Sequence, residues 1–346
     1  MAELIGIGIV GTGLSATMHL LALAQVQDVT VLAVAGTSQE RARAFAMQHR
    51  IPAAFGRVED LIATPGLRAI HLCTPPFARE EFALLAARAG IHVMIEKPMA
   101  RDLAEADRII EACRDGGVTL GAMFQFRFMP LPRQIKRHLA EEKLGRIFLA
   151  DCYAKWWRDP SYYASSSWRG RRDLEGGAVL INQAIHSIDL LQWLAGPVRR
   201  VSGRVATEVH SIEMEDIALA TVEFASGACG VIEASTATYP GYAERIELHG
   251  DRGSLVLNQG QGVAEWHLKG SEPESISAAD QRAEAARDPS KISLVGHIAE
   301  FEEFYAAIRA NRRPAIDGAE GRKALEIVKA IQLSSARGGT PVTLPL

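Results

Sequence analysis

The chain has 346 residues, of which 48% are hydrophobic and 23% are charged, and its formal net charge is -3 at pH 7. This composition is typical of a globular protein with a substantial core, and the length suits two domains. The charges form no basic stripe, which argues against a nucleic-acid partner. No apolar run reaches the roughly 20 residues that span a bilayer, so a membrane partner is not expected.

The start of the chain and its cysteines indicate the compartment. Residues 1–6 lack the cationic start and the apolar run of a signal peptide, which favours a cytoplasmic location. The four cysteines, Cys73, Cys113, Cys152 and Cys229, show no paired spacing. Such scattered cysteines indicate reduced, buried thiols, and we expect neither a disulfide nor a metal site.

The first 123 residues alternate between strand and helix patterns. Strands are predicted at 4–10, 29–35, 69–73, 92–95 and 119–123, and helices at 14–26, 38–49, 77–89 and 102–115. This alternation is typical of a parallel sheet with right-handed crossovers. We therefore predict an α/β domain over residues 1–123.

A different pattern begins at residue 124. Helices are predicted at 130–142, 177–195, 294–310 and 319–336, and a strand at 147–158. Between residues 198 and 268, six runs rich in Val, Thr, Ile and Glu are separated by short glycine-containing turns, which is typical of an antiparallel sheet. We predict a second, α+β domain over residues 124–346, in which 271–291 form a surface excursion. The C-terminal helices are candidates to pack back on the first domain.

A glycine turn, Gly11-Thr12-Gly13-Leu14-Ser15-Ala16, separates the first predicted strand from the first helix. Gly11 permits a tight turn, Gly13 lets the backbone approach a pyrophosphate, and Ala16 allows close packing of helix on strand. The helix N-terminus then presents free amides to the phosphates. A glycine turn without a ligand is the alternative. The position of the pattern within a strand–turn–helix unit favours a dinucleotide-binding Rossmann domain.

The end of the second strand bears on the choice of cofactor. It reads Ala35-Gly36-Thr37-Ser38, without the acidic residue that would bind the ribose hydroxyls of NAD and repel the 2′-phosphate of NADP. The Thr37 and Ser38 hydroxyls suit either cofactor, and Arg41 follows one helical turn later. NAD and NADP both stay open, with a preference for NADP.

Further motifs follow in a fixed order. They are Thr74-Pro75-Pro76, Glu96-Lys97-Pro98, Gly176-Gly177 and His186-Ser187-Ile188-Asp189. With the glycine turn, this order resembles the Gfo/Idh/MocA oxidoreductases over nearly the whole chain, and Glu-Lys-Pro is the most specific element. The resemblance implies a Rossmann domain followed by a domain with a large open, mostly antiparallel sheet. That sheet is commonly the oligomer interface in the family, so a homodimer or homotetramer is implied.

The resemblance also implies an activity and two catalytic residues. Family members mostly transfer hydride between a nicotinamide cofactor and a secondary alcohol carbon of sugars, inositols, sugar nucleotides or dihydrodiols. Lys97 would stabilise the charge that develops on the substrate oxygen, and His186 would move the hydroxyl proton. The alternatives are an exposed loop lysine and a core or capping histidine.

Several residues around these two are expected to contact substrate. Asn182, His186 and Asp189 have the spacing of one face of a helix. Many members carry Asp where this chain has Asn182, so Asn182 is expected to orient sugar hydroxyls rather than transfer protons. Asp189 is expected to contact substrate, with fixing the histidine or capping structure as the alternatives. Arg127 is either a substrate contact or a structural salt-bridge residue.

An aromatic segment over residues 153–169 contains three of the five tryptophans and three of the six tyrosines. Aromatic faces beside arginines suit a hydroxyl-rich ring, so Tyr163, Trp168 and Arg169 are expected to bind substrate. The alternative is a surface loop or an oligomer contact. In the earlier Thr-Pro-Pro loop, Pro76 and Arg79 replace a common Asn and His, so its hydrogen bonds must differ from those of the family.

These motifs together predict an NAD(P)-dependent dehydrogenase acting on CH–OH groups. An enzyme that uses NAD for transient redox in a lyase or hydrolase reaction and a non-catalytic dinucleotide-binding regulator are the alternatives. The predicted cofactor-binding residues lie at strand ends and at the first helix start: Gly11, Thr12, Gly13, Leu14, Ser15, Gly36, Thr37, Ser38, Thr74, Pro75, Glu96, Lys97 and Gln125.

Overall fold

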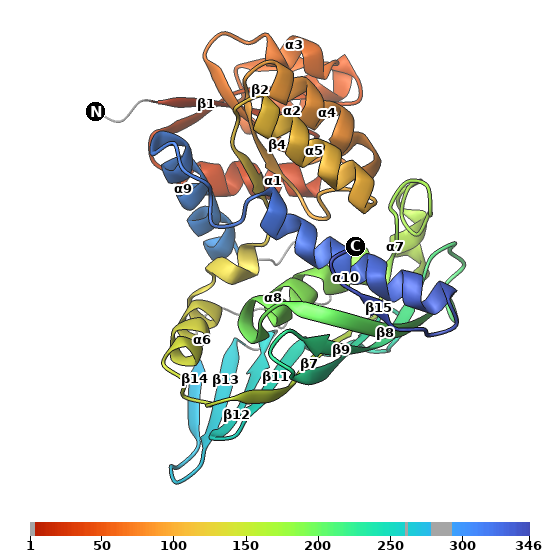
Figure 1. The fold of residues 1–346 in the computed structure, drawn as a ribbon. Helices are drawn as coiled ribbons and strands as arrows, with labels where there is room; N and C mark the ends of the chain where they lie inside the picture. The colour runs from red at the N-terminus through yellow and green to blue at the C-terminus, as the bar shows by residue number, and fades with distance from the viewer. Residues whose placement is uncertain (1–3, 260–261, 278–292) are drawn as a thin grey trace. The chain divides into compact units, whose positions relative to one another are not determined.

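The computed structural model describes residues 4–259, 262–277 and 293–346 (Figure 1). The chain divides into two compact units. The first comprises Met1–Gln125 and Leu294–Arg322, and the second comprises Phe126–Ser293 and Lys323–Leu346. The first unit is therefore built from two separate stretches of sequence.

The first unit contains a six-stranded parallel sheet in the order β3-β2-β1-β4-β5-β6. This is the doubly wound Rossmann order, which confirms the predicted fold. Its strands are β1 Ile5–Val10, β2 Val29–Ala35, β3 Ala53–Phe55, β4 Leu67–Leu72, β5 His92–Ile95 and β6 Leu120–Ala122. Its helices include α1 Leu14–Leu23, α2 Gln39–His49, α3 Val58–Ile62, α4 Arg79–Arg88 and α5 Leu103–Asp115. Strand β3 and helix α3 were not predicted, and they are only 3 and 5 residues long.

The core of this unit forms around the buried strand β1. All six of its residues are buried, as expected for a parallel strand covered on both faces. Helix α9, Val295–Arg309, packs against α1 although the two are far apart in sequence (Figure 1). It contributes Phe301, Phe304 and Tyr305 to the same core cluster as Ile7 and Ile9.

The second unit contains a nine-stranded sheet in the order β14-β13-β12-β11-β7-β10-β9-β8-β15. The neighbouring strands are antiparallel except β7 and β10, which confirms the mostly antiparallel prediction. The strands are β7 Ile147–Lys155, β8 Val198–Ala206, β9 Ile217–Phe224, β10 Cys229–Ser235, β11 Arg245–Gly250, β12 Gly253–Asn258, β13 Val263–Leu268, β14 Glu274–Ser277 and β15 Val342–Thr343. Strand β14 occupies part of the predicted excursion, and residues 278–292 lie outside the described residues.

Helix α8, Ile185–Ala195, packs on one face of this sheet against β7 and β11. The alternating residues Ala150, Cys152 and Ala154 of β7 are buried. Leu149, Asp151 and Tyr153 therefore point to the opposite face, because strand side chains alternate between the two faces. The other helices are α6 Pro130–Ala140, α7 Pro160–Ala164 and α10 Gly318–Ala336. No helix in the described ranges is long and apolar enough to cross a membrane.

The predicted single helix over 177–195 is wrong in its first part. A π-helix spans Val179–Ala184 and continues into α8 at Ile185. A π-helix is wider than an α-helix, so the assumed α-helical face that joined Asn182 to His186 and Asp189 does not apply. Such π segments are rare and often occur at functional sites.

Candidate active site

The glycine turn has the geometry that a pyrophosphate requires. Gly11 has φ +119°, and a Cβ there would lie 2.8 Å from the Cys73 carbonyl oxygen. A Cβ on Gly13 would meet nothing within 4 Å, so the space above Gly13 is open. Helix α1 begins at Leu14 without a side-chain cap. Its first amides are therefore available to an anion.

The end of β2 offers hydroxyls but no carboxylate. Thr37 and Ser38 are exposed, and Ser38 Oγ caps α2 by accepting a hydrogen bond from the Arg41 N–H at 3.2 Å. A Cβ on Gly36 would lie 3.2 Å from Thr12 Cγ2, so this corner is closely packed. None of Gly36, Thr37 and Ser38 carries a carboxylate that would repel a 2′-phosphate.

Arg79 explains how the Thr-Pro-Pro loop departs from the family pattern. Its buried guanidinium donates to the carbonyl oxygens of Thr74 at 2.9 Å and Glu96 at 2.7 Å, and to that of Pro98. Burial lowers the pKa of Arg79 to about 10, while Glu96 and Cys73 oppose that shift, so it remains a cation at neutral pH. Arg79 thus ties the loop after β4 to the loop that carries Lys97.

The Glu96 carboxylate lies beside half-buried Lys97 at the carboxyl end of β5. Its Oε2 accepts a hydrogen bond from the Lys97 N–H at 3.0 Å, and its Oε1 lies 3.1 Å from His19 Nε2. Burial alone would raise the pKa of Glu96, but the His19 hydrogen bond and the charges of Arg79 and Lys97 hold it well below its ordinary value. Glu96 is therefore an anion that can only accept hydrogen bonds.

Three fully buried side chains extend this contact into the core. His19 Nδ1 lies 2.8 Å from His71 Nδ1, and His71 Nε2 lies 2.6 Å from the Tyr305 hydroxyl. Burial and His19 hold the pKa of His71 well below its ordinary value, so His71 is neutral. Because the Glu96 carboxylate can only accept, His19 Nε2 donates to it. We call Tyr305, His71, His19 and Glu96 the histidine chain.

Gln125 is the remaining predicted cofactor contact. It is buried, 6% exposed, and follows β6 at the start of a short 3-10 helix. All the predicted cofactor residues belong to the first unit. Most lie at or after the carboxyl ends of β1, β2, β4, β5 and β6, which meet at one edge of a parallel sheet, where ligands bind in this fold.

His186 lies in the first turn of α8 in the second unit and is 8% exposed. Its ring packs against Phe126 with the centroids 4.8 Å apart. In the adjoining π-helix, Asn182 donates to the Glu175 carboxylate, which also accepts from the Gly170 N–H. Glu175 is 1% exposed and was not predicted. The only hint in the sequence is its position directly before Gly176-Gly177.

Arg127 and Asp189 form a buried bidentate ion pair. The N–O distances are 2.8 Å and 2.6 Å, and the side chains are 5% and 1% exposed. The structural alternative for Arg127 therefore has direct geometric support. The pair joins the segment after β6 to helix α8.

A second buried carboxylate anchors the start of the π-helix. Glu215 Oε1 accepts from the Ala178 N–H at 3.0 Å and the Leu180 N–H at 3.4 Å. Gln332 of α10 also donates to Glu215, and burial raises the pKa of Glu215. Glu215 was not predicted, because its partners lie far from it in the sequence.

The aromatic segment is tied together by arginines. The Arg169 guanidinium lies 4.5 Å from the Tyr162 ring centroid and 5.2 Å from that of Trp168. The Tyr163 hydroxyl is 2.8 Å from Thr236 Oγ1. Tyr163 and Arg169 line a hollow of about 550 Å³, together with residues of the 210–213 loop. Trp168 is half-buried.

These features define an oxidoreductase of the dinucleotide-binding class. The profile described as "Oxidoreductase family, NAD-binding Rossmann fold" matches residues 5–124, and the profile described as "GFO/IDH/MocA C-terminal domain" matches residues 133–256. The chain belongs to the Gfo/Idh/MocA oxidoreductase family, as the motifs predicted.

Similar proteins cover almost the whole chain. The 1,5-anhydro-D-fructose reductase of Ensifer adhaerens is 26% identical over 96% of each chain, and the myo-inositol 2-dehydrogenase of Thermotoga maritima is 25% identical over 92% of each. The solved WlbA dehydrogenase of Bordetella pertussis, in complex with NADH and UDP-GlcNAcA, is 28% identical with a TM-score of 0.86, covering 100% of this chain and 99% of that one.

Proposed function

We propose that this protein is an NAD(P)-dependent dehydrogenase that transfers hydride between a nicotinamide cofactor and a secondary alcohol carbon of a sugar, cyclitol or sugar nucleotide. The observation that carries this proposal is the Glu96–Lys97 element at the carboxyl edge of the parallel sheet, held by Arg79 and His19. The relatives named above act on sugar or cyclitol rings, which supports the substrate class.

In the proposed reaction Lys97 and His186 have separate roles. The Lys97 ammonium hydrogen-bonds the reacting oxygen and stabilises its developing negative charge. The His186 imidazole accepts the hydroxyl proton during oxidation and returns it during reduction. A nicotinamide cofactor held by the glycine turn and the neighbouring strand ends of the first unit would supply the hydride-transfer chemistry. The anionic Glu96 holds the Lys97 backbone by accepting a hydrogen bond from its N–H.

The residues near His186 divide into two proposed roles. Asn182, Tyr163, Trp168 and Arg169 are proposed substrate contacts, and the hollow beside Tyr163 and Arg169 has room for a group attached to the sugar ring. Arg127 and Asp189 are proposed instead to position α8, because each satisfies the charge of the other within the protein.

The cofactor pocket is proposed to accept NADP as well as NAD, with a preference for NADP. The support is the end of β2, where Thr37 and Ser38 offer hydroxyl groups and no carboxylate is present among residues 36–38.

We also propose a cytoplasmic homodimer or homotetramer that associates through the open face of the nine-stranded sheet. The support is the family resemblance, together with the 49% exposure of Leu219 on β9 of that face. Light scattering would measure the mass.

The test of the activity is a panel of sugars, cyclitols and sugar nucleotides, monitored at the absorbance of reduced nicotinamide with NAD and NADP separately. We expect net reduction of cofactor with at least one ring alcohol, and a lower KM for NADP than for NAD. Turnover of substrate without net reduced cofactor would show the lyase or hydrolase alternative. Cofactor binding without any turnover would favour the regulator.

A further inference from the structure

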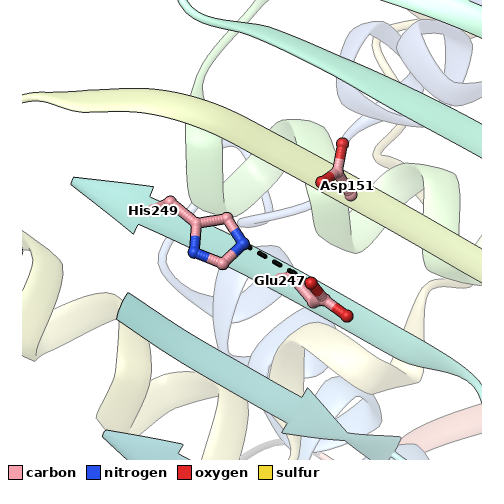
Figure 2. A group of neighbouring side chains, drawn as sticks. All are labelled: Asp151, Glu247 and His249. Atoms are coloured by element: carbon pink, nitrogen blue, oxygen red, sulfur yellow. Dashed lines mark ion pairs between the residues drawn. The ribbon is translucent and has the colours of Figure 1, made fainter. Parts of the chain in front are cut away.

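Three side chains that can ligate a metal meet on the sheet of the second unit. The register between β7 and β11 places Asp151 directly opposite Glu247, and His249 follows two residues later on β11. Side chains two residues apart on a strand share a face, so all three stand on the face opposite α8 (Figure 2). Their ligand atoms all lie within 4.8 Å of one another.

The charges in this cluster favour a cation. Asp151 is only 6% exposed, and one of its oxygens accepts a hydrogen bond from the Val231 N–H at 2.8 Å. Arg245 Nε contacts Glu247 Oε1 at 2.5 Å. Arg245 neutralises the charge of one of the two carboxylates, so the Asp151–Glu247 pair keeps one net negative charge. Carboxylates directly opposite each other destabilise a sheet, and a cation between them removes the repulsion.

The imidazole of His249 is held in the orientation of a metal ligand. Its Nδ1 lies 2.8 Å from the Ser254 hydroxyl oxygen, which can accept the Nδ1 proton and leave a lone pair on Nε2. That Nε2 lies 3.4 Å from Glu247 Oε2. Two atoms that ligate one zinc ion at about 2.0–2.1 Å in a tetrahedron are about 3.4 Å apart. A hydrogen bond to the second ring nitrogen is the usual support of a metal-bound histidine.

We propose that Asp151, Glu247 and His249 form a binding site for one divalent transition-metal ion, best matched by zinc. One imidazole and two carboxylates suit zinc and leave a fourth position for water. Magnesium prefers octahedral oxygen ligands and is expected not to compete. The ion ties β7 to β11 and is independent of the redox chemistry proposed above.

The experiment is zinc binding to the full chain after chelator treatment and dialysis, followed by calorimetry and by elemental analysis of the dialysed protein. We expect one zinc per chain, no binding of magnesium under the same conditions, and a higher melting temperature with zinc. Cobalt in place of zinc reports the ligand geometry through its visible absorption. Asp151→Asn and His249→Gln should each weaken zinc binding by at least about tenfold, the lower end of the loss for even an outer support residue.

A matched control lies on β13 of the same sheet. His267 Nε2 lies 3.9 Å from Glu265 Oε2, which repeats the Glu-x-His spacing, but the residues opposite Glu265 are Val256 and Ser275. His267→Gln should bind zinc as the unmodified protein does. The proposal is overturned by the absence of stoichiometric zinc in the folded wild-type protein. It is equally overturned by full affinity in His249→Gln, or by an equal loss in His267→Gln.

Discussion

The Tyr305 hydroxyl lies 2.6 Å from Nε2 of His71, although the two residues are 234 positions apart in the chain. Both side chains are fully buried. Through His19 this contact reaches the carboxylate that holds the Lys97 backbone. A hydroxyl on α9 therefore helps to fix the orientation of a carboxylate at the edge of the parallel sheet.

Tyr305→Phe tests the far end of the histidine chain. The substitution keeps the ring and leaves a buried imidazole nitrogen without its partner, so we expect a loss of about 1–3 kcal/mol in the free energy of unfolding. Denaturant unfolding measures it. Tyr242→Phe, at a side chain that is 57% exposed, is the control and should change stability by less than about 0.5 kcal/mol. Equal stabilities for the two variants would contradict the role of this hydrogen bond.

His71 makes stability depend on pH. Its pKa in the folded chain lies well below the ordinary 6.5 because of burial and His19. The unfolded chain therefore binds a proton that the folded chain does not. The stabilisation is complete above pH 6.5 and is lost as the pH falls below it, by up to about 1.4 kcal/mol per pH unit. His71→Asn should reduce that slope between pH 6.5 and 5, and an unchanged slope would assign it to other groups.

Lys97 and His186 are the proposed catalytic residues. Lys97→Ala and His186→Asn should each lower kcat by at least about 100-fold, as expected when a charge-stabilising or acid–base group is removed. Cofactor binding to His186→Asn, followed by fluorescence, should stay close to that of the wild type, since His186 belongs to the second unit. Turnover near the wild-type level in either variant removes that residue from the mechanism.

Two glycines of one turn should respond differently to alanine. Gly13→Ala meets nothing within 4 Å and Gly13 has φ -99°, so the melting temperature should be unchanged. Its methyl group occupies the approach to the pyrophosphate, so dinucleotide binding should weaken by about tenfold or more. Gly11→Ala clashes with the Cys73 carbonyl at φ +119° and should lower stability itself. Tight cofactor binding by Gly13→Ala would argue against the phosphate site.

A variant of the Arg127–Asp189 pair distinguishes a positioning role from a role in substrate binding. Asp189→Asn leaves a buried guanidinium without its anion, so we expect a loss of about 3–5 kcal/mol in the free energy of unfolding. Glu59→Gln in the exposed Arg57–Glu59 pair is the control, at about 0–1 kcal/mol. If Asp189→Asn keeps normal stability and only its KM rises, Asp189 is instead a substrate contact.

The sequence predicts best where a local pattern is strong. The strand–glycine turn–helix start of the chain and the run of short antiparallel strands were both identifiable, because their periodicity and turn residues are local. The three-residue strand β3 has no such periodicity. The π-helix over Val179–Ala184 also has no local signal, because its amides are anchored by Glu215, which is distant in sequence.

The partnerships of single polar residues were the least predictable part of the site. His19 and His71 occur singly within apolar segments, and only the folded sheet and α9 bring them together with Tyr305. The zinc proposal depends in the same way on the register of β7 with β11. The scattered cysteines predicted no metal site, and a site built from Asp, Glu and His on two strands has no local spacing signal in the sequence.

The two-part composition of the first unit has a consequence for synthesis. Residues Leu294–Arg322 complete that unit, and they leave the ribosome after nearly all of the second unit. Domains usually fold in the order in which they are made. The core of the N-terminal sheet is complete only after the aromatic residues of α9 have been synthesised. The dinucleotide-binding edge is therefore translated first, and its supporting core is completed only near the end of translation.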